Sequence, residues 1–191
     1  TVQTYYKAPL TDSNFSFDAD FYMNLYPDLR NAFGFDHQAA LNHWNNTGIN
    51  EGRRASREFD VVFYLNQYPD LKQAFGNNYA AALNHWKTAG INEGRQGSRE
   101  VNVSYYLNLY GDLRNAFGQN YRAALNHWKT TGLTEGRQAS AQFAINNYFN
   151  RYADLRTAFQ YTNSFSTFKD DNTLGLLHWV STGIREGRVG N

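Results

Sequence analysis

The sequence predicts an all-α protein made of four tandem helical repeats of 42 residues. Three signatures support this, because each occurs four times and always in the same order: Tyr-x-Asp-Leu, then His-Trp, then Gly-x-x-Glu-Gly-Arg. Self-similarity at a fixed period of this length is typical of repeat architectures. The signatures begin at Tyr26, Tyr68, Tyr110 and Tyr152; at His43, His85, His127 and His178; and at Gly48, Gly90, Gly132 and Gly183.

The spacing also sets the repeat boundaries. The step between copies of a signature is 42 residues, except that His178 follows His127, and Gly183 follows Gly132, by 51. The fourth repeat therefore carries nine extra residues near 160–172. An atypical terminal repeat is common in such arrays. The predicted divisions of this single domain are an arm at 1–16 and repeats at 17–58, 59–100, 101–142 and 143–191.

Each repeat is expected to contain three short helices, as the second shows. Asp60 suits an N-cap, so a helix is expected near 61–67. Pro69 favours the first turn of the next helix, and Gly76 suits its end. A third helix is expected over about 78–89. One apolar helical stripe is formed by Tyr64, Tyr68, Leu71 and Phe75.

One 42-residue repeat could hardly bury a sufficient core alone, whereas stacked repeats could share a continuous one. All four Trp occupy a single column of the repeat and are expected to be buried. The array is either an open solenoid or a closed helical bundle, and the sequence does not separate the two. The residues before the repeats, 1–16, are expected to form an extended arm.

Composition excludes several classes of protein. Hydrophobic residues make up 41% of the 191 residues and aromatic residues 17%, which excludes a disordered tail. The formal charge of +1 argues against a nucleic-acid partner. Cysteine is absent, which excludes disulfides and thiol chemistry. No apolar run approaches the length of a membrane span, and no cofactor is expected.

The string Phe-Asp-x-x-x-Tyr-Leu-x-x-Tyr-Pro-Asp-Leu, followed by His-aromatic and Gly-x-x-Glu-Gly-Arg, resembles a short helical repeat of many secreted bacterial proteins. The resemblance covers all but the first 16 residues. This chain departs from it at Gly111, Ala153 and Gln160. In that family the repeat accompanies calcium-binding nonapeptide arrays, glycan-processing enzymes and glycosyltransferases, none of which is present here. The resemblance implies an accessory or binding module that is secreted or on the cell surface.

A polar set recurs with the same spacing in the first three repeats and gives the candidate ligand-binding residues. Its members are Asn42, His43, Glu51, Arg53, Asn84, His85, Glu93, Arg95, Asn126, His127, Glu135 and Arg137. The fourth repeat has Leu177 in the Asn column.

Each column of this set, that is, each position of the repeat, has two interpretations. The His either bonds to a neighbouring loop or contacts a ligand beside an aromatic ring. The helical Asn either caps a group or contacts a ligand. Arg53 either pairs with Asp28 or Glu51, with equivalent pairs in the other repeats, or it forms a polar ligand pocket together with the Glu.

Neither a metal site nor catalysis is expected. One His per repeat gives no local chelate. Asp170, Asp171 and Asn172 offer oxygen ligands for calcium, although a solvated loop is the better interpretation. The carboxylate pair of Asp28 and Glu51 recurs in every repeat, but four identical active sites in one small chain would be unusual.

Three hypotheses about function follow. The first is a secreted multivalent carbohydrate-binding protein, lectin-like or adhesin-like, with similar weak sites along the chain and glycans as partners. The second is a surface-layer or fibre subunit that self-associates through the N-terminal arm. The third, an enzyme, is disfavoured.

Overall fold

The computed structural model describes residues 15–162 and 168–191, and there the chain is helical apart from one short strand pair. Each repeat contains three seven-residue α-helices, and the third runs directly into a five-residue π-helical turn. The predicted all-α tandem repeat is therefore confirmed.

The elements of repeats 1 and 2 are α1 (Ala19–Leu25), α2 (Pro27–Phe33), α3 (His37–His43), η1 (Trp44–Gly48), α4 (Val61–Gln67), α5 (Pro69–Phe75), α6 (Tyr79–His85) and η2 (Trp86–Gly90). Those of repeats 3 and 4 are α7 (Val103–Leu109), α8 (Gly111–Phe117), α9 (Tyr121–His127), η3 (Trp128–Gly132), α10 (Ile145–Arg151), α11 (Ala153–Phe159), β1 (Gln160–Thr162), β2 (Phe168–Asp170), α12 (Asn172–His178) and η4 (Trp179–Gly183). The antiparallel strands β1 and β2 occupy the insertion of repeat 4. Three residues per strand are too few for an alternating pattern to be recognised.

The helix boundaries in the second repeat arise as the sequence predicts. The Asp60 carboxylate accepts hydrogen bonds from the backbone N–H of Val62 and Phe63, both at 3.0 Å. Pro69 opens α5, and the residue before it is extended, as proline requires. Gly76 ends α5 with φ +57°. The third predicted helix differs, because its last turn is π-helical from Trp86 onward.

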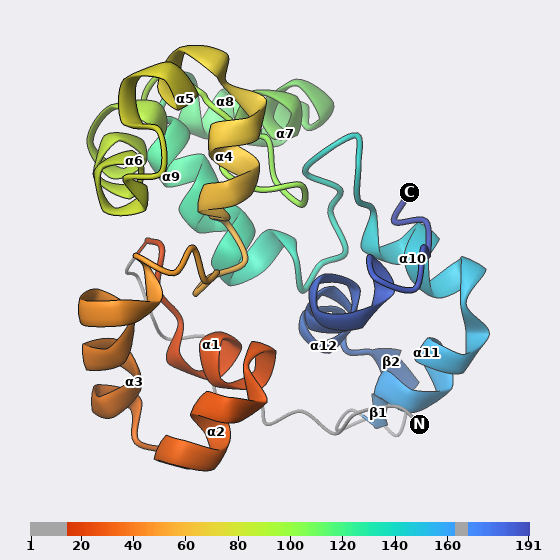
Figure 1. Cartoon of the computed structure of the whole chain (residues 1–191). Coiled ribbons are helices and arrows are strands. Elements are labelled where there is room, and N and C mark those ends of the chain that lie inside the picture. The colour runs from red at the N-terminus through yellow and green to blue at the C-terminus, as the bar shows by residue number, and fades with distance from the viewer. Residues whose placement is uncertain (1–14, 163–167) are drawn as a thin grey trace.

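The linkers between repeats form the inner layer of the molecule, whereas the helices lie outside (Figure 1). One backbone hydrogen bond per repeat joins each linker to the next, at the same position every time. These bonds run from Asp18 N to Ala55 O (2.8 Å), Asp60 N to Gly97 O (2.9 Å), Asn102 N to Ala139 O (2.7 Å) and Ala144 N to Gly190 O (2.9 Å).

The array is a closed bundle rather than an open solenoid, because its first and last repeats meet. Helix α1 contacts α12, and Figure 1 shows repeat 4, in blue, beside the first repeat, in red and orange. A pocket of about 410 Å³ remains at this seam, with Tyr26 and Arg54 from one side and Val180 and Arg185 from the other.

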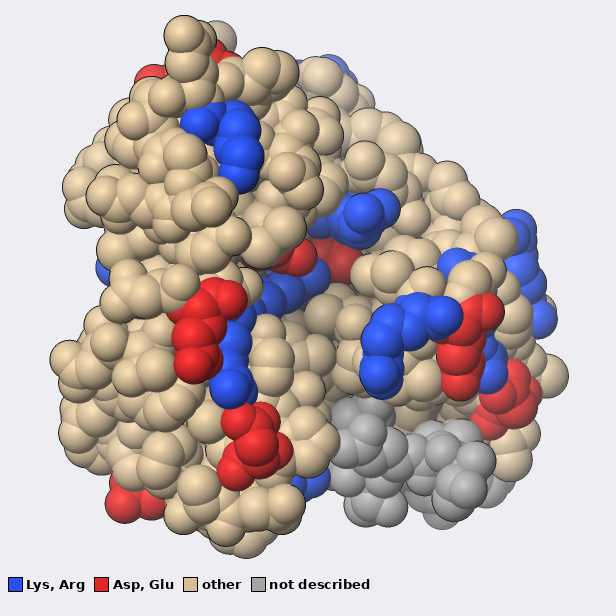
Figure 2. Space-filling view, in the orientation of Figure 1, with Lys and Arg blue, Asp and Glu red and all other residues tan. Residues whose placement is uncertain are grey.

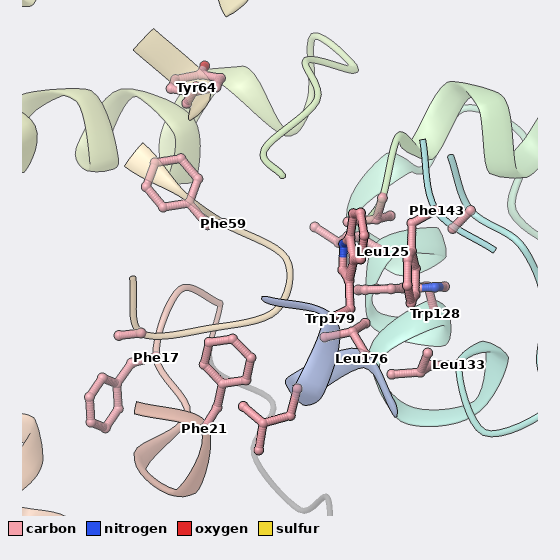
Figure 3. Packing of buried hydrophobic residues seen from close by; sticks show 14 of the residues in the cluster. Phe17, Phe21, Phe59, Tyr64, Leu125, Trp128, Leu133, Phe143, Leu176 and Trp179 are labelled. Atoms are coloured by element: carbon pink, nitrogen blue, oxygen red, sulfur yellow. The ribbon is translucent and has the colours of Figure 1, made fainter. Parts of the chain in front are cut away.

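A single apolar cluster runs through all four repeats. The four Trp are only 1–7% exposed, as predicted. Figure 3 shows Phe143 and Trp179 side by side in this core, and their rings stack at 5.5 Å. Repeat 4 has Gly175 on α12, where the other repeats have Ala, and Phe149 fills the space above it.

Residues 1–14 of the predicted arm lie outside the described residues. Its last two, Phe15 and Ser16, pack against the inner layer, and the Ser16 N–H donates to Glu58 at 2.7 Å. Within the described part of the chain, every helix is too short or too polar to cross a bilayer.

Candidate functional site

The histidine column has a structural partner within each repeat. Oη of Tyr22 and Nδ1 of His43 share a hydrogen bond at 3.0 Å. The ring of Phe33 lies 5.8 Å from the same imidazole, so α1, α2 and α3 meet around it. The other repeats form the same 3.0 Å bond in the pairs Tyr64–His85, Tyr106–His127 and Tyr148–His178.

The partner of the His is thus a tyrosine on the first helix of the repeat. The predicted bond to a neighbouring loop is wrong. Burial raises the pKa of the Tyr22 hydroxyl, so that group stays protonated. In repeat 4 the imidazole itself is buried, and burial together with the nearby Arg188 lowers the pKa of His178.

The predicted arginine clamp is confirmed. Arg53 donates from Nε to Glu51 at 2.6 Å and from Nη1 to Asp28 at 2.8 Å. Its guanidinium lies over the Tyr26 ring, 4.9 Å from the centroid. Since the Tyr26 hydroxyl accepts from the backbone N–H of Arg54 at 2.7 Å, the clamp also holds the start of the linker.

All four repeats carry this clamp, which we call the Asp–Arg–Glu clamp. Its copies are Asp28–Arg53–Glu51, Asp70–Arg95–Glu93, Asp112–Arg137–Glu135 and Asp154–Arg188–Glu186. The hydrogen bond from Arg95 holds the pKa of Asp70 below its ordinary value, so this carboxylate is ionised at neutral pH.

The clamps face solvent. The side chain of Asp28 is 59% exposed and that of Glu51 45%, whereas that of Arg53 is only 22% exposed. Figure 2 shows charged side chains of opposite sign lying together in small groups, separated by wide uncharged surface. Each clamp therefore presents carboxylate oxygens to solvent, held in place by a guanidinium that is partly covered.

The asparagine column lies elsewhere on the repeat. Asn42 and Asn84 are exposed on α3 and α6, and Asn126 is half-buried on α9. The Asn42 side chain accepts from Gln38 one turn earlier at 3.0 Å, so it caps no helix end. The fourth member of the column, Leu177, is buried.

The structure therefore brings together only part of the predicted set. His, Glu and Arg of one repeat belong to one cluster with the first-helix Tyr, and the charges of Arg188 and Glu186 act on His178. No described contact joins the Asn side chains to the clamps. The Nδ1 atom of the His is bonded to the Tyr hydroxyl, and the Phe ring packs against the imidazole.

Sequence reasoning missed a buried set of charges in the inner layer. Arg54 donates to Glu100 at 2.7 Å, and Lys129 donates to Glu58 at 2.9 Å. Both glutamates are fully buried, and Glu100 also accepts from the indole N–H of Trp179 at 3.1 Å. The signal available in the sequence was the recurrence of Glu58 and Glu100 one repeat apart, immediately before apolar positions.

The described part of the insertion places Asp171 in a structural role. Asp171 is buried and accepts from the backbone N–H of Leu174 at 3.1 Å, so it is the N-cap of α12 and not part of a solvated loop. Among the residues that the structure describes, no cluster of three His, Asp or Glu could hold a metal ion.

A search for related proteins returned no match to this chain among family models, curated proteins or solved structures.

Proposed function

We propose that this chain is a non-enzymatic, multivalent carbohydrate-binding protein, secreted or displayed at a cell surface. The observation that carries the proposal is the fourfold copy of the exposed Asp–Arg–Glu clamp on one closed body. Carboxylates that project from a fixed guanidinium accept hydrogen bonds from vicinal sugar hydroxyls, and charge-assisted hydrogen bonds of this kind are the stronger ones.

Repetition compensates for weak single sites. A small, open site supports millimolar affinity, about −4 kcal/mol, and several such sites on one rigid body gain avidity for a branched or surface-bound glycan. The low net charge and the resemblance to a repeat of secreted bacterial proteins agree with a role outside the cell.

A glycan array on the full chain identifies the sugar, and calorimetry with the monovalent form then counts the sites. We expect a stoichiometry near four if the clamp alone makes the site. A value near three would mean that the Asn column takes part, because repeat 4 has the buried Leu177 there.

Variants of one repeat test the location of the sites. Asp70→Asn with Glu93→Gln should reduce the stoichiometry by one, while Lys72→Gln, an exposed cation in the same repeat, should leave it unchanged. Absence of binding to any glycan, together with ordered self-assembly, would favour the surface-layer or fibre subunit instead.

A further inference from the structure

A cavity of about 620 Å³ lies where the first three repeats meet, away from the clamps. The linker before α1 and one face of α3 form its floor, while Lys87 from η2 and Arg122 from α9 reach it from repeats 2 and 3. Its volume is typical of small-molecule sites. It depends on Phe15, which stands where the later repeats have Arg57, Arg99 and Ala141, so the other repeats cannot form the same wall.

Aromatic rings cover one side of this cavity. Phe17 and Trp44 both line it, and their ring centroids are 5.4 Å apart. Phe15, also in the lining, meets the Trp86 ring edge to face at 6.4 Å. These surfaces suit the apolar face of a ring-sized ligand.

Two cations line the cavity together with these rings. The Arg122 guanidinium lies 5.1 Å from the centre of the Phe15 ring and donates to the backbone oxygen of Lys87, so these two residues are adjacent. Within residues 15–162 and 168–191, neither Arg122 nor Lys87 has a carboxylate partner. Asp20, an acid beside this cavity, is occupied by His37 at 2.9 Å.

We propose that this cavity binds one small ligand that carries a carboxylate on a ring-sized body. The carboxylate pairs with Lys87 and Arg122, and the ring lies against Phe17 and Trp44. An acidic sugar such as a hexuronate and a simple cyclic acid share this chemistry. The site is separate from the four clamps and does not depend on their function.

Calorimetry on the full chain with glucuronate, benzoate and glucose tests the proposal. We expect one acid molecule per chain, with affinity that falls as salt is added, and no binding of glucose in the cavity. Lys87→Gln and Arg122→Gln should each weaken acid binding about ten-fold, or about 1.4 kcal/mol. Arg114→Gln, an exposed cation of repeat 3 outside the cavity, should not.

The compounds used in the calorimetry distinguish the possible sources of the ligand. Binding of glucuronate alone supports an acidic sugar, and binding of benzoate alone supports a non-saccharide acid. Binding of neither acid at millimolar concentration, or binding that Lys87→Gln leaves unchanged, overturns the proposal. Asp70→Asn with Glu93→Gln removes one clamp and should leave the cavity intact, so failure of the clamp function is distinguished from failure here.

Discussion

The hydroxyl group of Tyr64 occupies the space in which a side chain at Gly90 would lie, since a Cβ there would be 2.3 Å from Oη. The same hydroxyl bonds to His85 at 3.0 Å. Every repeat has this arrangement, with the corresponding separations between 2.0 and 2.3 Å. The first glycine of Gly-x-x-Glu-Gly-Arg therefore does more than end a helix. It leaves room for the tyrosine hydroxyl that bonds to the His.

Gly90→Ala should therefore destabilise the protein, by about 1–3 kcal/mol, which is typical of overpacking. This is the reverse of the usual helical preference for Ala over Gly. Urea unfolding followed by circular dichroism measures the change. Gly111→Ala is the matched control, because its Cβ would have no atom nearer than 3.7 Å, and we expect it to be neutral or stabilising.

Adding Tyr64→Phe should recover part of the loss, although alone it removes the bond to His85 and destabilises by about 1 kcal/mol. If the two effects simply add, the hydroxyl is not what excludes a side chain at Gly90.

The charge pair at the inner layer gives a second prediction. Glu100→Gln removes the carboxylate that the buried Arg54 contacts at 2.7 Å and leaves it only the longer pair with Asp60 at 4.0 Å. Breaking a buried ion pair in this way typically destabilises by about 3–5 kcal/mol. Asp70→Asn removes a carboxylate from an exposed ion pair and should have little effect on stability, because water screens that pair.

The chain provides its own template for a rescue. One repeat later, the positions of Arg54 and Glu100 are occupied by Gln96 and Gln142, which bond to each other at 2.7 Å. Arg54→Gln combined with Glu100→Gln should therefore be much more stable than Glu100→Gln alone, as measured by urea unfolding. Equal stability of the single and double variants would contradict this.

The sequence predicts most of the local structure but not how the parts face one another. The caps at Asp60, Pro69 and Gly76 act over a few residues, so their effect could be predicted. The π-helical turn at Trp86–Gly90 could not, because its glycine packs against Tyr64 of another helix, a contact that the local sequence does not show.

Closure and the site were harder to predict for the same reason. Partners such as Glu58 and Lys129 lie 71 residues apart, and their columns show only that a polar residue recurs. The clamp of Arg53 was predictable because its Glu is two residues away and its Asp is 25 residues away in each of the first three repeats. The binding role of the Asn column stays a prediction.

Mild acid should destabilise the protein through His178 of the fourth repeat. Burial and Arg188 lower the pKa of His178 below its ordinary value of 6.5, so the unfolded chain binds more protons than the folded one just below pH 6.5. The stabilisation is therefore present above pH 6.5 and is lost as the pH falls toward the folded-state pKa.

Urea midpoints at neutral and mildly acidic pH measure this loss, and a titration of the imidazole signals by NMR measures the pKa directly. His178→Gln should lack that part of the pH dependence. An imidazole of His178 that titrates above pH 6.5 would show that the sign is wrong.

Trp86 distinguishes a core residue from a binding platform. It is 1% exposed, the Phe59 ring stacks on it at 4.6 Å, and Gly97 allows the linker to pass so closely that a Cβ there would be 2.8 Å from the indole nitrogen. Removing the indole leaves a cavity that linker and helices together cannot fill. Trp86→Ala should therefore destabilise by about 3–5 kcal/mol, and Trp86→Phe by less. Thermal melting measures both, with ligand binding followed in parallel below the transition. Unchanged melting combined with lost sugar binding would make Trp86 a ligand contact and would reject its role in the core.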